Sequence, residues 1–314
     1  KFAALSIINN ANIWGVINLL IFILINAVSF IIFLNIGELW YFRGVIGISE
    51  NAAKRKEVSS DELNRISVRQ SILKACTIKE LKLLFRTPIY FMNCVLINFI
   101  FPILMIIPFI TDPQSYSELS EIKAVMQSGT FDSIIVQVGF AAAMLISTFN
   151  CITPTSVSRE GQNFYVSKFL AVPYKTQIMA KVLSGVVVSL IGVLIAFISV
   201  AIILGVPVYL LFMIAIISLL GIVCTSFTGV MIDLLHPKLN WDNEQKAVKQ
   251  NINPVANMLL GIILGVAVVW ACVALNLDVL LTCGIIFLVF GIIDLVLYKV
   301  VSTIGVKLFG NIEV

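Results

Sequence analysis

The chain has 314 residues, of which 60% are hydrophobic and only 12% are charged, with a formal net charge of +4. A soluble domain carries about 25% charged residues, so half that share is too small to cover a water-facing surface. Together with a mean hydropathy of +1.04, this composition excludes an ordinary soluble protein and indicates a chain that lies in a lipid bilayer.

Long stretches without a charged residue divide the sequence into candidate membrane spans. The longest stretch, 182–232, exceeds the roughly 20 residues that cross the hydrocarbon core once, so it suits two spans joined by a tight turn at 205–207. Each span must satisfy its own backbone hydrogen bonds in lipid, so all are expected to be helices. The sequence predicts an all-α, polytopic transmembrane bundle of about seven spans at 13–36, 89–110, 133–152, 182–204, 209–234, 255–275 and 279–300.

The basic residues predict the orientation of these spans. Alternation of seven spans places 19 of the 21 Lys and Arg residues on one side and only Lys1 and Lys123 on the other. Loops rich in Lys and Arg remain in the cytoplasm. We therefore expect a multi-pass protein of the cytoplasmic membrane with a cytoplasmic C-terminus.

The same topology predicts how the chain is divided. Its first residue falls outside the cell, so we expect that at least one more span precedes Lys1 in the natural protein. Residues 1–37 would then hold the last span of an upstream membrane unit. Residues 38–71 are the least hydrophobic and are expected to form a cytoplasmic linker, and residues 72–314 a six-span transmembrane domain.

A helix with two distinct faces is predicted at 72–86, directly before the second span. Lys79, Lys82 and Arg86 share one stripe of this helix, and apolar side chains share another. Such a helix lies along the inner headgroup boundary, and Thr87-Pro88 is expected to end it. It would act as an elbow into the membrane or only as an anchor.

The loop at 154–181 mixes aromatic residues with Lys and Arg. Exposed aromatics beside basic residues are typical of a protein docking surface, but these aromatics would also suit a loop that folds back onto the membrane interface. Ser156 or Ser158 is expected to cap a short helix that ends at Pro173.

The loop at 236–254 predicts a second short helix outside the membrane. Asp242 and Glu244 precede Lys246 and Lys249, which is the favourable charge order along a helix. The only histidine, His236, lies beside a proline and is expected to be a loop residue rather than a catalyst.

Few polar residues remain within the predicted spans. Asp294 is the strongest candidate for a substrate or proton site, because ionisable groups at membrane depth are commonly functional. It lies five residues before Lys299, however, which also suits a position near the inner interface. Hydrogen bonds between helices are expected from Asn18, Asn26, Asn93, Asn98 and Asn150, and close helix approach from Gly261 and Gly265.

Six short segments match a known family. They are KELKLLFRTP at 79–88, SVSREGQNF at 156–164, LAVP at 170–173, AK at 180–181, PKLNW at 237–241 and AVKQN at 247–251. The chain from about residue 38 onward resembles the permease subunits of ABC-2-type exporters, particularly the large two-half exporters of low-GC Gram-positive bacteria. PKLNW is the most distinctive of these segments.

The resemblance implies a transmembrane permease that is driven by ATP hydrolysis on a separate ATPase subunit. The helix with Lys79, Lys82 and Arg86 would match the connector helix. The loop that couples to the ATPase would contain Ser158, Arg159, Glu160, Gly161, Phe164, Tyr165 and Lys168. A second cytoplasmic loop would contribute Pro237, Lys238, Trp241 and Lys249.

The expected chemistry is that of a transport subunit and not of an enzyme. The chain has no Gly-x-x-x-x-Gly-Lys-Ser/Thr phosphate loop, so ATP is expected to act only through the partner subunit, with no catalytic residue, cofactor or metal in this chain. Expected partners are the ABC ATPase, the lipid bilayer, and either a missing N-terminal half or a second permease copy. Nucleic acid is not an expected partner, and the sequence does not indicate the transported substrate.

Two other functions compete with the exporter hypothesis. An ion-driven secondary transporter needs intramembrane acids or broken helices at the midplane, and Asp294 is the one deep acid. An intramembrane enzyme needs clustered ligands or a base beside a nucleophile, and the sequence shows neither pattern.

Overall fold

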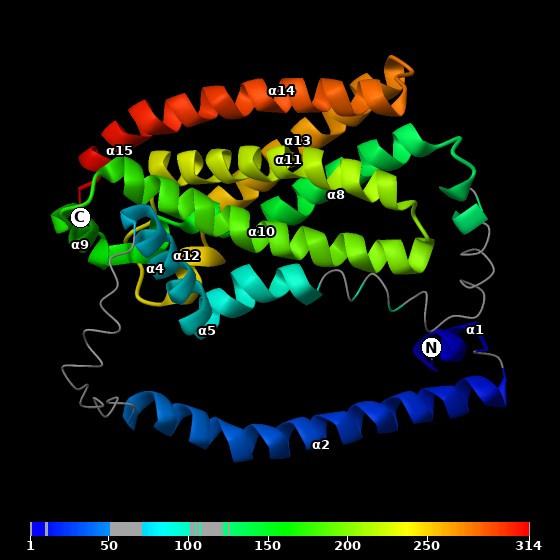
Figure 1. Ribbon diagram of the computed structural model, residues 1–314. Helices are drawn as coiled ribbons and strands as arrows, with labels where there is room; N and C mark the ends of the chain where they lie inside the picture. Colours follow the sequence, from blue (N-terminus) through cyan, green and yellow to red (C-terminus); the bar gives the residue numbers. More distant parts are fainter. Residues whose placement is uncertain are drawn as a thin grey trace, which may run out of the picture. The chain divides into compact units, whose positions relative to one another are not determined.

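A computed structural model gives the structure of the chain. It describes residues 2–9, 12–50, 71–100, 104, 107, 122–124 and 126–313, with the backbone alone at 39–50. All regular structure within these ranges is helical (Figure 1). The chain divides into unit 1, residues 1–69, and unit 2, residues 70–314, and each is described separately.

Unit 1 consists of two helices, α1 (Phe2–Ile8) and α2 (Ile13–Glu50). The predicted span 13–36 lies within α2, but the helix continues to Glu50 because no proline interrupts it. The predicted linker at 38–71 therefore begins as helix, and its residues 51–70 lie outside the described residues. None of the residues from Val16 to Glu38 is buried.

Unit 2 contains five long apolar helices that lie side by side (Figure 1). Helix α11 contacts the other four. With α2 these make six candidate spans in the described residues, or seven when the bent segment 72–100 is included, so the predicted all-α polytopic bundle is confirmed. The five helices are α8 (Asp132–Phe149), α10 (Tyr174–Leu204), α11 (Val208–Leu235), α13 (Asn253–Ala274) and α14 (Val279–Val300).

The predicted break at Thr87-Pro88 is present as a sharp elbow. Helix α4 (Ile72–Arg86) meets the helical segment Pro88–Ile100 at 87°. Thr87 is extended, with φ −90° and ψ 110°, because the proline that follows it disfavours the helical region. The segment after the elbow comprises α5 (Pro88–Tyr90), a π-helix (Phe91–Val95) and residues 96–100. Most of the predicted span beyond residue 100 lies outside the described residues.

Helix α10 begins eight residues earlier than the predicted span at 182–204. It starts directly after Pro173, which is well suited to precede a first helical turn, so Lys175 and Lys181 lie within the helix. The predicted turn at 205–207 is confirmed. Gly205 adopts φ +65° and ends α10, and Pro207 starts α11.

The helix cap predicted in the 154–181 loop is wrong. The loop forms two short 3-10 helices, Thr153–Thr155 and Ser158–Asn163, followed by α9 (Phe164–Phe169). Ser158 donates its hydroxyl to Asp233 instead of capping a helix, and the Ser156 hydroxyl has no partner among the described residues.

Within the described ranges, one of the five predicted interhelical asparagines bonds to another helix. Asn150 donates to Ser189 Oγ on α10 at 2.6 Å, in a buried polar group that also contains Ser147 and Thr225. Each of the others donates to the carbonyl four residues earlier in its own helix: Asn18, Asn26, Asn93 and Asn98. A side-chain amide bonds locally when no partner helix presents an acceptor.

Small residues let the elements of unit 2 approach closely. A Cβ on Gly261 would lie 2.5 Å from Thr148 Cγ2, so this glycine brings α13 onto α8 within the chain. Thr153 lies between Gly185 of α10 and Gly229 of α11, and a Cβ on either glycine would overlap its side chain. Thr153 therefore acts as a wedge between α10 and α11, and the two helices accommodate it because each has a glycine at the point of contact.

We expect Gly229→Ala to destabilise unit 2 by about 1–3 kcal/mol, the typical cost of overpacking a filled interior. The added methyl would overlap Thr153 and lie 3.1 Å from the backbone nitrogen of Pro154, which cannot move freely. Thermal unfolding in detergent measures the loss. Gly291→Ala is the matched control, because a Cβ there meets nothing within 4 Å. Equal melting temperatures for the two variants would contradict the wedge.

Candidate functional site

Four segments gather at one end of unit 2. They are α4, the 153–173 loop, the 236–252 loop with α12 (Glu244–Val248), and α15 (Val306–Asn311), which follows a π-helix at Val301–Gly305. Figure 1 shows α4, α9, α12 and α15 at this same end of the bundle. It is called the basic end below, because 153–173, 236–252 and α4 carry most of the loop Lys and Arg residues of unit 2.

A buried lysine lies at the centre of the basic end. Lys181 of α10 is 1% exposed. Its Nζ atom lies 2.7 Å from Glu160 Oε1, 3.2 Å from Glu80 Oε1 and 2.9 Å from the carbonyl of Ser156. Three donors thus meet three acceptors, which is the complete requirement of an ammonium group.

A second lysine completes this cluster from the surface. Lys79 Nζ lies 3.6 Å from Glu80 and 3.5 Å from Glu160, and its side chain is 52% exposed. Ser167 donates to the second carboxylate oxygen of Glu160 at 2.7 Å. We call Lys79, Glu80, Glu160 and Lys181 the charge joint. The negative charges of its two glutamates balance the positive charges of its two lysines.

The charge joint links three elements that are distant in sequence. Glu80 belongs to α4, Glu160 to the 153–173 loop and Lys181 to α10. An unpaired charge in such a buried place costs several kcal/mol, so each partner holds the others in position. The joint therefore fixes α4 and the loop to the end of a membrane helix.

A further buried acid, outside the charge joint, fixes the same loop to α11 and, through Asn253, to α13. Asp233 is fully buried and accepts hydrogen bonds from the backbone nitrogens of Val157 and Ser158 at 2.6 and 3.1 Å, and from the Ser158 hydroxyl. Asn253 donates to it at 2.9 Å and to the carbonyl of His236 at 2.8 Å. One carboxylate thus ties the ends of two spans to the loop.

The 236–252 loop lies directly on the 153–173 loop. Trp241 Nε1 donates to the Ser158 carbonyl at 2.8 Å, and the Lys238 nitrogen donates to Ser158 Oγ at 2.9 Å. Gly161 lies under the indole ring with φ +54° and ψ −138°, a conformation that is essentially restricted to glycine. A Cβ there would lie 2.6 Å from Trp241 Cζ2, so glycine is required by the backbone and by the contact.

Arg159 is buried and forms no ion pair with a carboxylate in the ranges that the structure describes. It is 3% exposed and donates to the Ile152 carbonyl at 2.6 Å and to Thr155 Oγ1 at 2.8 Å, while its guanidinium lies over the Tyr90 ring. Tyr90 in turn donates to the Arg159 carbonyl at 3.3 Å. Arg159 therefore holds the first turn after the elbow against the 153–173 loop.

The structure buries most of the predicted coupling residues and leaves Tyr165 exposed, beside Phe169, which was not among them. Ser158, Arg159, Gly161 and Phe164 are buried, and Glu160 is nearly so, and these residues form the inner side of the loop. Tyr165 and Phe169 are 51% and 85% exposed, and their rings lie edge to face with centroids 6.5 Å apart. The loop thus presents an aromatic outer face on a rigid base.

The C-terminal segment supports this outer face from behind. Lys168 donates to the carbonyls of Gly310 and Ile312. Phe164 packs on Phe309 with ring centroids 4.8 Å apart. Lys168 is therefore a residue that holds α9 on α15.

The predicted residues of the 236–252 loop have mixed roles. Lys238 donates to the Gln250 carbonyl at 2.6 Å, and Lys249 is exposed. The predicted short helix is present as α12, with Asn243 as its cap. Lys246 pairs with Asp242 on the surface at 2.7 Å, and this hydrogen-bonded partner lowers the pKa of Asp242 below its ordinary value.

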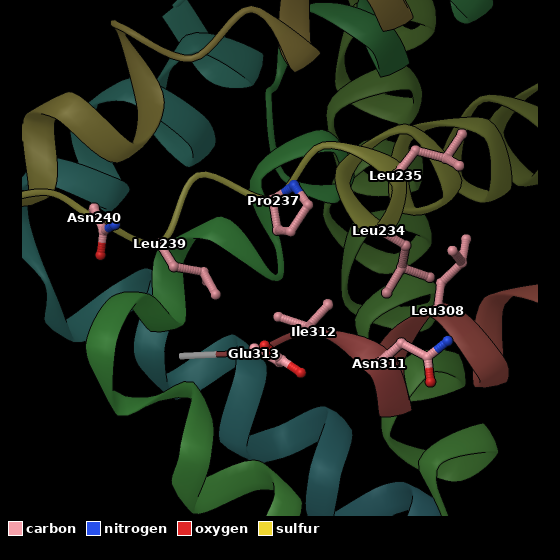
Figure 2. A pocket seen from close by; sticks show the side chains of 9 residues that line it. All are labelled: Leu234, Leu235, Pro237, Leu239, Asn240, Leu308, Asn311, Ile312 and Glu313. Carbon is pink, nitrogen blue, oxygen red and sulfur yellow. The ribbon is translucent and has the colours of Figure 1, made fainter.

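Residue Pro237 lines a pocket of about 390 Å³ beside the C-terminus. Figure 2 shows it between the loop that carries Pro237 and Leu239 and the segment that carries Ile312. Its wall is mostly aliphatic and includes Leu234, Leu235, Pro237, Leu239, Asn240, Leu308, Asn311, Ile312 and Glu313.

Sequence reasoning assigned no role in the site to Glu80, Lys181 or Asn253, and it expected only an interfacial role for Asp233. One signal pointed to two of them, because Lys181 and Asp233 are the charges that bound the longest uncharged stretch. A charge next to so long an apolar run is placed at a membrane boundary, where a buried partner is expected.

Asp294 lies away from the basic-end cluster, on α14. It is 8% exposed, and neither carboxylate oxygen has a hydrogen-bond partner in the part of the chain that the structure describes. Its helix packs on α11, in a cluster of apolar side chains that includes Phe290 and Cys224. The predicted intramembrane acid is thus buried inside the bundle and does not face lipid.

The fold and the site define a multi-pass helical membrane protein whose loops at one end are fixed to its spans by buried ionic groups. Comparison with protein families, curated proteins and solved structures found no match.

We expect Lys181→Met to destabilise the protein by about 3–5 kcal/mol, the typical cost of leaving buried charges without a partner. Adding Glu80→Gln and Glu160→Gln should restore part of the loss, because the stranded carboxylates are then neutral. Thermal unfolding in detergent measures both.

Lys246→Met is the matched control for this series. It removes one partner of an exposed pair, which typically changes stability by less than about 1 kcal/mol. If Lys181→Met were as mild as this control, the charge joint would not hold the basic end together.

Proposed function

We propose that this chain is the transmembrane permease subunit of an ATP-driven, ABC-2-type exporter of the cytoplasmic membrane. The basic end would face the cytoplasm, with the C-terminus on the same side. A separate ABC ATPase would bind there and supply the energy of ATP hydrolysis. The remaining half of the transporter would come from an upstream part of the protein or from a second copy.

One observation carries this proposal. The 153–173 loop exposes two aromatic side chains on its outer side, Tyr165 and Phe169, while its inner side is bonded to α4, α10 and α11. Asn253 of α13 bonds to the same Asp233 carboxylate that holds the loop on α11. A push on the outer face would therefore be transmitted to the ends of several spans at once. An energy-coupling element needs this combination of an exposed contact and a rigid attachment.

The elbow supports the same proposal. Helix α4 lies at 87° to the segment that follows it. Its Glu80 pairs with Lys181 of α10, and its Lys79 pairs with Glu160 of the loop. It matches the expected connector helix in length, in its basic stripe and in its place before a span. Movement of the loop would rotate α4 and the following segment together.

An ion-driven transporter is the second candidate, and one observation favours it. Asp294 is a buried carboxylate without a hydrogen-bond partner among the described residues, and such a group in a membrane bundle is suited to take up a proton or a cation. Transport that survives ATP depletion but stops when the proton gradient collapses would favour this function over the exporter.

The exporter proposal predicts that an ATPase subunit co-purifies with the chain from its native membrane in mild detergent. Phe169→Glu together with Tyr165→Glu should lower recovery about tenfold or more, because loss of a central aromatic contact commonly costs 2 kcal/mol or more of binding free energy. Quantitative mass spectrometry of the captured proteins measures the recovery.

Phe131→Glu serves as the control, since Phe131 is 44% exposed and lies at the opposite end of unit 2, before α8. All variants must give a monodisperse, folded protein. An intact wild-type chain that recovers no ATPase would overturn the proposal. If the loop variant recovered as much ATPase as the wild type, the contact with the ATPase would not lie at Tyr165 and Phe169.

A further inference from the structure

A shallow hollow of about 440 Å³ follows the exposed side of α4 to the elbow. Lys79, Lys82 and Arg86 line it together with three apolar residues, Ala75, Ile78 and Leu83, and with Thr87 at the elbow. The proposed export function uses the buried side of α4, through Glu80 and Leu84. The function of this outer side is a separate question.

The hollow has an excess of positive charge. Of its three cations only Lys79 lies near carboxylates, and these already face Lys181. Lys82 and Arg86 are exposed and form no ion pair within the residues that the structure describes. A lysine and an arginine about one turn apart are well suited to hold a phosphodiester, with the guanidinium as a fork and the ammonium as a point charge.

The position of the hollow indicates which kind of molecule carries that phosphate. It ends at Thr87, where the chain turns by 87° into an apolar segment. Phe85 and Met92, on either side of the turn, are 52% and 63% exposed. A site that is cationic along its length and bordered by exposed apolar side chains at the turn matches a molecule with an anionic head and an acyl tail.

We propose that the hollow on α4 binds the headgroup of an anionic phospholipid. The phosphate lies between Lys82 and Arg86, and the glycerol and upper acyl chain lie along Ile78 and Leu83. An acidic protein segment would match the charge but would leave the apolar walls and Phe85 in water. Lys79 lines the hollow and also belongs to the charge joint, so the bound lipid strengthens the attachment of α4 to the 153–173 loop.

The test uses the full chain in a neutral detergent, with phosphatidylglycerol as the anionic probe and phosphatidylcholine of the same acyl chains as the neutral probe. Native mass spectrometry measures the ratio of bound anionic to bound neutral lipid. The wild type should retain phosphatidylglycerol preferentially. Lys82→Gln with Arg86→Gln should reduce that preference about 25-fold, from about fivefold for each basic side chain near a lipid surface.

Two controls distinguish a site from general attraction. The variant Lys175→Gln, Lys299→Gln and Lys307→Gln removes exposed charge elsewhere on α10, α14 and α15 and should keep the preference. Inorganic phosphate should not raise the melting temperature, whereas phosphatidylglycerol should. Lys82 and Arg86 are outside the charge joint, so their variant should fold with the wild-type melting temperature in neutral detergent.

Three results would overturn the proposal. They are equal retention of both lipids by the wild type, equal loss of preference in the control variant, and stabilisation by inorganic phosphate as large as that by the lipid. Loss of ATPase recovery in the Lys82 and Arg86 variant without any change in lipid retention would assign the hollow to an acidic protein surface. The lipid measurement needs no ATPase, so it can fail or succeed independently of the export function.

Discussion

A lysine ammonium that is removed from water at the end of an apolar helix remains charged only if carboxylates and carbonyls replace its hydration shell. Lys181 meets this condition with Glu160, Glu80 and the Ser156 carbonyl, each from a segment other than its own helix. Because no one of these groups is satisfied without the others, their burial fixes where α4 and the 153–173 loop lie. Asp233 imposes the same constraint from α11, with backbone nitrogens as its donors.

These two buried centres fix the inner side of the basic end and leave its outer surface exposed. The conspicuous residues of the 153–173 loop, Arg159 and Glu160, turn inward and are used in structure. Among the exposed residues of this loop are the aromatics Tyr165 and Phe169 on α9, which Lys168 and Phe164 hold on α15. We therefore expect the aromatic face to contact a partner at this end, and the buried charged residues to hold that face in position.

The sequence was sufficient for the spans that fall within the described residues, for the elbow and for the turn at 205–207, because each depends on local properties: apolar length, the restriction before proline, and the positive φ of glycine. It was insufficient for the charge joint, because that depends on which segments meet. Glu80 and Lys181 are 101 residues apart, and no periodicity relates them. The asparagines could not be told apart from the sequence for the same reason. Asn150 donates to Ser189 on a neighbouring helix, whereas Asn98 donates to a carbonyl of its own helix.

The central claim is that the charge joint makes α4 and the 153–173 loop a single rigid body, and a distance distribution between the two elements tests it most directly. Spin labels placed through unnatural amino acids at the exposed positions 82 and 165 leave the six native cysteines unmodified. In lipid nanodiscs, double electron–electron resonance should give one narrow distance for the wild type and a broad distribution once Lys181 is replaced by Met. A broad distribution in the wild type, or an equally narrow one in the variant, would contradict the account.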